Sequence, residues 1–413
     1  MKLSKFFLVL TSTLMVVLCM ILFKINNSDI KITEIAGDKS ALSNATIISE
    51  TIESMYQVKE ININKDGIKN KNFTFSKPVR FGDEDDIVTS SNILNYNKNN
   101  NKMYKIKDRV GTMYASLYYN EPENSFESEL IVDIDEENIK TKKVNSYTIN
   151  LGAFFDDSQS NVCVSSVPVV YKDDLYAVIG VDIDDFNKTN KFEGSSDISR
   201  IYVYKLDLEN ETSDMVLVKD MSEDGYYGLG YNISFSKDDT AYFVNEKYSK
   251  DKNNKNIITF ELLSFNVKTR TFNTIELGKN INDTGIMYID EVYIIDNKAY
   301  LINEYNYDNN KFKIKEIEVD LEKNKVTNKD KTYVLDIDEN TNDVSYSLQN
   351  IRCIDNKLFI SIQFQEYEYS SVKSPAISSN YVFVVDRESK ETLYAVKIEA
   401  GLGKNSTISV VNE

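Results

Sequence analysis

The sequence predicts an all-β protein built from one four-stranded antiparallel unit that is repeated six times along the chain. Three observations lead to this prediction. The 413 residues include 27 Tyr and 20 Phe but only 14 Gly and 4 Pro, a composition typical of strands rich in aromatic and β-branched residues. Two sets of turn residues recur at a long, regular spacing, and several of the runs beside them alternate between apolar and polar residues, as half-buried strands do.

The first set of turns joins the first and second strands (a and b) of each unit. Each turn holds Asp or Asn, which tolerate a left-handed backbone, and is followed by an apolar residue that restarts a strand. These turns begin at Asp173, Asp238, Asp296 and Asp355. The aromatic residues that follow are about 60 residues apart, at Tyr176, Tyr242, Tyr300 and Phe359.

The second set of turns joins the third and fourth strands (c and d). Its first polar residue is predicted at Asn64, Asp133, Asp207, Asn266, Asp320 and Asp386. The first and fifth copies agree closely, with VKEINI at 58–63 and IKEIEV at 314–319. This agreement extends the repeat back to about Lys31, so it covers almost the whole chain beyond its first apolar run.

Four antiparallel strands in a repeated unit are the pattern of a β-propeller, whose blades bury both faces by packing on one another. We count six blades. The segment Asp85 to Lys107 contains further strand-like residues, and the alternative is that they complete a seventh blade. The segment Ser406 to Val411, near the C-terminus, is expected to pair with the first blade and close the ring.

The N-terminus carries an uncharged apolar run, Phe6 to Phe23, with lysines on both sides. Its length is close to that of a membrane-spanning helix, and Lys2 and Lys5 favour a cytoplasmic start. No small-residue cleavage site follows the run, which favours a retained signal anchor over a cleaved signal peptide. We therefore expect residues 1–24 to be a single transmembrane helix and residues 25–413 to be a β-propeller domain outside the cell membrane.

Charge and residue types exclude several functions. Lys and Arg number 48 against 65 Asp and Glu, a net charge of −17, which argues against nucleic-acid binding because phosphates attract clustered cations. The chain has no His, which excludes His-dependent catalytic sets and His-ligated metals. Beyond the anchor only Cys163 and Cys353 remain, predicted as buried free thiols. We predict no catalytic residues, no metal site and no cofactor.

Two Asp-rich segments, at 182–187 and 336–342, resemble the start of a calcium loop. An EF-hand would have Gly where the second segment has Thr341, and Glu where the chain has Ser347. Both segments are therefore expected to be solvated turns. The alternative is a weak calcium site of another type.

The predicted b–c loops are long, at 119–126, 181–199, 247–256, 304–311 and 366–380, whereas the a–b and c–d turns are short. The b–c and d–a connections leave a blade at the same end, so that end is the expected binding face. Tyrosine offers a ring for stacking and a hydroxyl for hydrogen bonding. The candidate binding residues are Phe154, Phe155, Tyr226, Tyr227, Tyr305, Tyr307, Tyr367 and Tyr369; alternatively, their rings cover blade edges.

With its Lys-flanked anchor, its Asp-Asn-Lys turns and its Lys-, Asn- and Ile-rich strands, the chain resembles signal-anchored, extracytoplasmic β-propeller-like proteins of low-GC Gram-positive bacteria. The resemblance brings no catalytic residues with it, and a propeller fold alone does not fix a function. We expect a membrane-tethered binding or scaffold module whose partner is a membrane protein complex or a cell-envelope polymer. The alternatives are a hydrolase that uses Asp and Glu on an envelope glycan, and a structural spacer.

Overall fold

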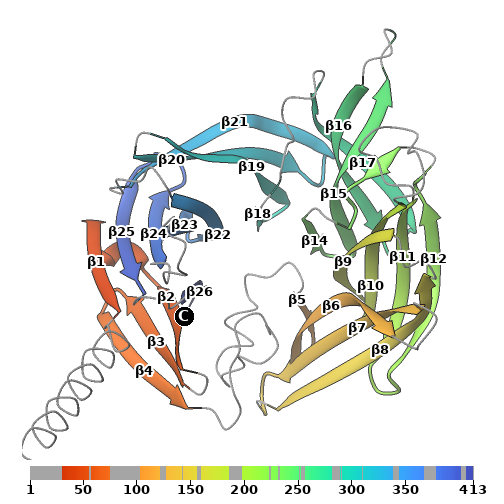
Figure 1. Ribbon diagram of the computed structural model, residues 1–413, viewed down its shortest axis with the longest axis horizontal. Helices are drawn as coiled ribbons and strands as arrows, with labels where there is room; N and C mark the ends of the chain where they lie inside the picture. Colours follow the sequence, from red (N-terminus) through yellow and green to blue (C-terminus); the bar gives the residue numbers. More distant parts are fainter. Residues whose placement is uncertain are drawn as a thin grey trace, which may run out of the picture. The chain divides into compact units, whose positions relative to one another are not determined.

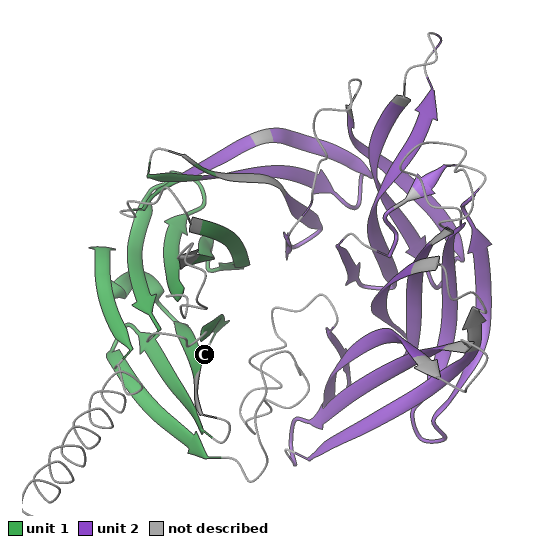
Figure 2. Ribbon diagram, in the orientation of Figure 1, with its two compact units in different colours: residues 1–89, 307–312, 335–413 green, residues 90–306, 313–334 purple. Residues whose placement is uncertain are grey.

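The computed structural model shows an all-β chain that divides into two compact units (Figures 1 and 2). The first unit holds residues 1–89, 307–312 and 335–413, and the second holds 90–306 and 313–334. The residues that the structure describes are 30–54, 57–74, 103–120, 127–141, 143–155, 160–185, 198–222, 225–230, 233–250, 252, 256–280, 289, 291–308, 310–337, 344–366, 378–400 and 406–412. No helix within these ranges is long and apolar enough to span a membrane. The predicted anchor lies outside them.

The first unit contains two sheets, which we call the first and the sixth. The first has the strand order β26-β2-β3-β4, and the sixth has the order β1-β25-β24-β23-β22. A 3-10 helix, Lys39–Leu42, joins β1 to β2. The strands are β1 (Lys31–Gly37), β2 (Ala45–Ser54), β3 (Gln57–Asn64), β4 (Gly67–Thr74), β22 (Val344–Ile354), β23 (Lys357–Glu366), β24 (Ser378–Asp386), β25 (Thr392–Glu399) and β26 (Ser406–Asn412).

The second unit contains the second to fifth sheets, apart from the ends of β19, β20 and β21 that belong to the first unit. The second and third sheets are formed by β5 (Met103–Ile106), β6 (Arg109–Asn120), β7 (Glu127–Asn138), β8 (Val144–Phe155), β9 (Ser160–Tyr171), β10 (Asp174–Asp185), β11 (Ile198–Asp207) and β12 (Thr212–Asp220). The fourth and fifth are formed by β13 (Tyr226–Tyr227), β14 (Ser234–Lys237), β15 (Thr240–Lys250), β16 (Asn256–Asn266), β17 (Thr271–Asn280), β18 (Glu291–Ile295), β19 (Lys298–Asp308), β20 (Lys311–Asp320) and β21 (Lys325–Asp336).

Each sheet is an antiparallel meander of four strands or of four with one addition, so the six sheets are the blades of a six-bladed β-propeller. The predicted fold class is thereby confirmed. The strand-like residues from Met103 form β5, the first strand of the second sheet, and the described residues form no seventh blade. The predicted count of six blades is confirmed, and the alternative of a seventh is not, because the second sheet needs this segment to reach four strands.

Strands from the two ends of the chain pair with each other inside the first unit. β26 pairs with β2 from Ser406↔Thr51 to Asn412↔Ala45, which confirms the predicted pairing of the C-terminal segment with the first blade. β1 adds a fifth strand to the sixth sheet by pairing with β25, a pairing that the sequence did not predict. The first and sixth sheets are therefore both formed from N-terminal and C-terminal segments.

The a–b turns of the second to sixth sheets are two-residue hairpin turns, and two of them have a left-handed backbone at both central residues. Lys172 and Asp173 have φ values of 53° and 68°, and Asp355 and Asn356 have values of 50° and 61°. Positive φ at both central residues is typical of the type I′ turn, whose twist matches that of the strands. The turn after β9 lies one residue earlier than predicted, because Asp174 already pairs with Tyr171.

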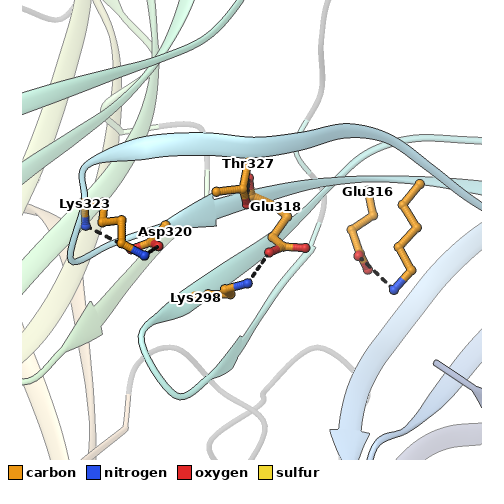
Figure 3. Close-up of polar contacts among 7 residues, drawn as sticks. Lys298, Glu316, Glu318, Asp320, Lys323 and Thr327 are labelled. Carbon is orange, nitrogen blue, oxygen red and sulfur yellow. Dashed lines mark hydrogen bonds and ion pairs between the residues drawn. The ribbon is translucent and has the colours of Figure 1, made fainter. Parts of the chain in front are cut away.

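The c–d turns are closed by the side chain that begins them. The Asn138 Oδ1 atom accepts hydrogen bonds from the Lys140 and Thr141 backbone amides at 3.0 and 2.9 Å, and Asp320 Oδ1 accepts from Lys323 at 2.9 Å (Figure 3). The predicted second copy at Asp133 was wrong. Asp133 lies inside β7, where it accepts a hydrogen bond from Thr148 Oγ1, and Asn138 holds the turn position instead.

Apolar clusters fill the space between neighbouring sheets within each unit. In the first unit, Ile47, Ile63 and Val410 of the first sheet pack with Phe359 and Val384 of the sixth. Among the described residues, neither Cys163 nor Cys353 forms a disulfide bond, as predicted. They are half-buried rather than buried.

The c–d turns should make the fold sensitive to acid. Hydrogen bonds lower the pKa of Asp207, mainly from the Asn210 side chain, and of Asp320 and Asp386, mainly from the Lys323 and Ser389 backbone amides. A carboxylate with a lowered folded-state pKa stabilises the fold above about pH 4, and this contribution is lost as the pH falls through the folded-state value. Replacing all three by Asn should therefore reduce the loss of stability on acidification.

Urea unfolding at pH 7 and pH 3 measures this effect. Asp214→Asn, at an exposed position on β12 outside the turns, is the control. An unchanged difference between the two pH values in the triple variant would show that the turns do not carry the acid sensitivity.

Candidate binding site

Five aromatic side chains gather at the b–c and d–a end of the sixth sheet, and we call them the aromatic platform. Its members are Tyr307, Phe312, Tyr346, Phe364 and Tyr381. The first two come from the tip of the β19–β20 hairpin, and the others from β22, β23 and β24. All five belong to the first unit.

Strand register explains why these rings meet. Tyr346 lies near the start of β22 and pairs directly with Phe364, near the end of β23. Tyr307 is the second-to-last residue of β19, and Phe312 is the second of β20. Sequence reasoning placed a loop over residues 304–311, but both strands continue almost to the turn at Asn310, which has a φ of 60°. Tyr307 therefore lies on a strand rather than in a loop.

The rings of the aromatic platform pack edge to face. The Tyr307 centroid lies 5.2 Å from that of Phe364 at an interplanar angle of 78°, and 5.9 Å from that of Tyr346 at 63°. Phe312 meets Tyr346 at 5.7 Å and 86°, and Phe364 meets Tyr381 at 5.4 Å and 73°. Aromatic pairs favour such arrangements, so each ring is fixed by at least one neighbour.

The aromatic platform has a buried base and a partly exposed top. Phe312, Phe364 and Tyr381 are almost completely buried, whereas Tyr307 and Tyr346 are half-buried. The Lys397 Nζ atom lies 5.5 Å from the Tyr381 ring centroid, a cation–π distance. Tyr307 was a predicted binding residue. Tyr346 was missed, because only its register with Phe364 places it beside Tyr307.

Tyr226, another predicted binding residue, is 5% exposed and packs in the apolar cluster between the third and fourth sheets. Its hydroxyl donates a hydrogen bond to Glu261 Oε2 at 3.1 Å. The Lys247 Nζ atom lies 4.9 Å from the centre of its ring. These are the contacts of a packed side chain, and they correspond to the alternative in which the rings cover blade edges.

The segment that follows Tyr226 is held tightly against the third sheet. Gly230 donates its backbone N–H to Asp182 Oδ2 at 2.6 Å, and Ser165 Oγ donates to the Leu229 carbonyl at 2.5 Å. A Cβ atom on Gly230 would lie 2.2 Å from the Cys163 carbonyl oxygen, so only glycine fits there. Segment 225–230 therefore connects the third and fourth sheets by hydrogen bonds to both.

Asp182 is completely buried in β10 and also accepts a hydrogen bond from Ser199. The expectation that segment 182–187 is a solvated turn was wrong for this residue, because β10 continues through it. Asp336 ends β21 and is largely exposed, with Lys311 3.7 Å away. Among the described residues no three Cys, Asp or Glu side chains form a group that could hold a metal ion.

The side chains of the remaining predicted binding residues lie outside the described part of the structure. Phe154 and Phe155 end β8, Tyr227 lies in β13 and Tyr305 in β19, with side chains outside the described set. Tyr367 and Tyr369 lie wholly outside the described residues. Their roles stay predictions.

Buried carboxylates recur on the third strand of several blades. Glu136 accepts hydrogen bonds from Tyr104 and Arg109, both at 3.1 Å. Glu316 accepts one from Tyr293 and lies 3.7 Å from Lys331 Nζ, in the same sheet as the Lys298–Glu318 pair at 2.6 Å (Figure 3). With Tyr226 and Glu261, this makes three blades in which a first-strand tyrosine reaches a third-strand glutamate.

Glu246, on β15, differs from these because its hydrogen bond comes from a neighbour on its own strand. The Tyr248 hydroxyl donates to Glu246 Oε2 at 2.8 Å. Burial raises the pKa of Glu246 above its ordinary value, and the Tyr248 hydrogen bond offsets this only in part. A raised pKa is what a general acid needs at neutral pH.

No family model matches the chain, and no curated protein matches it in sequence. Among solved structures, the chain is similar to YjhT at 9% identity, with 85% of this chain and 96% of that one covered and a TM-score of 0.33. It is similar to a variant of the Synechocystis apocarotenoid oxygenase at 7% identity, with 94% of this chain and 97% of that one covered and a TM-score of 0.42. It is also similar to the Bombyx mori GH32 β-fructofuranosidase BmSUC1 at 10% identity, with 86% of this chain and 84% of that one covered and a TM-score of 0.30. Scores this low carry no argument about function.

The packing of Tyr226 predicts that it matters for stability. Tyr226→Ser should lower the free energy of unfolding by about 3–5 kcal/mol, as removal of a large buried ring does. Tyr226→Phe should cost only about 1 kcal/mol, because it removes one hydrogen bond. Urea unfolding of both variants measures the difference. If Tyr226→Ser unfolds like the wild type but loses a binding partner, the tyrosine is a recognition residue instead.

Proposed function

We propose that this protein is a membrane-tethered, extracytoplasmic binding or scaffold module that recognises a protein or an envelope polymer through the b–c and d–a end of its blades. The observation that carries the proposal is the aromatic platform, where Tyr307 and Tyr346 stand half-exposed on a buried aromatic base. The N-terminal apolar run between Lys5 and Lys24 supports the membrane tether.

The rings of the aromatic platform are preorganised for binding. A ring already fixed by edge-to-face contacts loses little conformational entropy when a partner binds, so more of its contact energy appears as affinity. Tyrosine is common among the residues that dominate binding energy, because it combines a large apolar surface with a polar tip. Residues at the ends of rigid strands are well suited to recognition for the same reason.

The proposal predicts that two substitutions remove binding without unfolding the protein. Tyr307→Ala with Tyr346→Ala should weaken binding by about 2 kcal/mol or more, because the partner would lose both exposed rings. The measurement is a pull-down from crosslinked membranes with residues 24–413 as bait, together with co-sedimentation on purified cell-wall glycan. Recovery on one arm identifies the partner as protein or polymer.

Tyr118→Ala provides the matched control, since Tyr118 is a tyrosine of β6, in the second unit, with 56% of its surface exposed. It should retain every partner that the double variant loses. Equal recovery with the wild type, the double variant and the control would place the binding surface elsewhere. No recovery on either arm with the wild type would count against a binding function.

A second candidate function is a carboxylate-dependent hydrolase acting on an envelope glycan, and the raised pKa of Glu246 favours it. An acid with a raised folded-state pKa destabilises the fold in its ionised form, so this penalty is absent below about pH 4.3 and complete above the folded-state value. Glu246→Gln should therefore raise the melting temperature at pH 7 and leave it nearly unchanged at pH 4.

The hydrolase reading predicts in addition that the wild type releases reducing sugars from cell-wall glycan and that Glu246→Gln does not. Stabilisation of the variant without any wild-type turnover would leave Glu246 as a buried structural residue.

A further inference from the structure

The interface between the first and sixth sheets contains a buried polar layer beside its apolar cluster. In the sixth sheet, Asn350 pairs with Ser361, and Gln363 in the next row pairs with Asn380. In the first sheet, Ser49 pairs with Ile408, and Thr51 in the next row pairs with Ser406. The polar layer consists of the side chains of Ser49, Thr51, Asn350, Ser361, Asn380 and Ser406.

Two hydrogen bonds between the sheets show that these rows face each other. The Asn380 Nδ2 atom donates to Ser406 Oγ at 2.5 Å, which joins the row of Thr51 to that of Gln363. Arg352 donates to the Val410 carbonyl two rows away. The row of Ser49 lies between these two contacts and therefore faces the row of Ser361.

Five oxygen atoms of the polar layer are buried without a hydrogen-bond partner among the described residues. They are Ser49 Oγ, Thr51 Oγ1, Asn350 Oδ1, Ser361 Oγ and Asn380 Oδ1. Ser49, Thr51 and Asn380 are completely buried, and Ser361 is 1% exposed. Leaving one such group unpaired costs about 1–3 kcal/mol, so five in one place indicate a shared ligand.

The chemistry of the polar layer identifies the class of ligand. Three hydroxyls can both donate and accept, and the two amide oxygens can only accept, so the ligand must donate several hydrogen bonds and accept others. Two positively charged side chains disfavour a cation here. Lys59 pairs with Thr51, and Arg352 lies on the other side of the Ser49 row. A small neutral molecule with both capacities remains, and water is the smallest such molecule.

We propose that the polar layer binds an enclosed cluster of ordered water molecules, which bridge the first and sixth sheets where strands from the two ends of the chain meet. Buried waters of this kind make about three hydrogen bonds each to polar groups that would otherwise be unpaired. The cluster would thus replace direct hydrogen bonds between the sheets.

Thr51→Val and Ser361→Ala test the proposal, because each removes one hydroxyl and little volume. If water bridges the layer, each variant removes one hydrogen-bond partner of a water molecule and should lower the melting temperature by about 2 °C. If the layer is dry, each removes an unpaired buried hydroxyl and should raise the melting temperature. Thr407→Val is the control, since Thr407 is half-buried on the opposite face of β26 and should shift neither way.

A high-resolution crystal structure of the wild type provides the second readout. The expected result is ordered water density within hydrogen-bond distance of at least two of the five oxygen atoms, reduced in Thr51→Val. A metal ion in that density, or a melting temperature that depends on sodium or potassium but not on choline, would overturn the assignment to water. An empty layer with a raised melting temperature in the variants would overturn it as well.

Discussion

The pairing of β2 with β26 is the interaction on which the first unit depends. Seven successive residue pairs join the N-terminal strand to the C-terminal one. Without β26, the first sheet would lack its first strand, and Ile408 and Val410 would leave the apolar cluster shared with the sixth sheet. A meander of three strands cannot cover that face, and its unpaired edge would be open to other chains. The pairing of β1 with β25 reinforces the same junction.

The two candidate features of the first unit lie on opposite faces of the sixth sheet. The aromatic platform uses Phe364 of β23, whereas the polar layer uses Ser361 of the same strand. Residues separated by an odd number along a strand point to opposite faces. One strand thus links the proposed recognition surface to the interface that joins the chain ends, so a loss of that interface should also disturb the platform.

The sequence predicted the repeat well, because its turns have strong local signals. The hairpin turn at Asp355 and the side-chain-closed turn at Asp320 need particular residues, and these residues can be recognised without tertiary contacts. The error at Asp133 has a simple cause: β7 carries acidic residues inside the strand. An Asp or Asn therefore marks a turn only where a backbone amide two or three positions later donates to its side chain, as after Asn138.

The candidate site was less predictable, because it depends on register between distant segments. Tyr307 could be selected from its place next to a turn, but nothing local distinguishes Tyr346 from other strand tyrosines. Tyr226 was selected because it lies in a predicted connection at the b–c and d–a end of the blades. The glycines beside it allow close packing between blades, as the lack of room for a Cβ between Gly230 and the Cys163 carbonyl shows, and the Tyr226 ring is buried. Burial of this kind follows from packing, which a single sequence does not reveal.

Native-state hydrogen exchange tests the dependence on β26 most directly. The full chain should be compared with a chain that ends at residue 405, with peptides that cover 45–54 as the readout. We predict that these amides are strongly protected in the full chain and lose protection in the shortened chain, because β2 loses its hydrogen-bonded neighbour. Equal protection of residues 45–54 in both chains would contradict it.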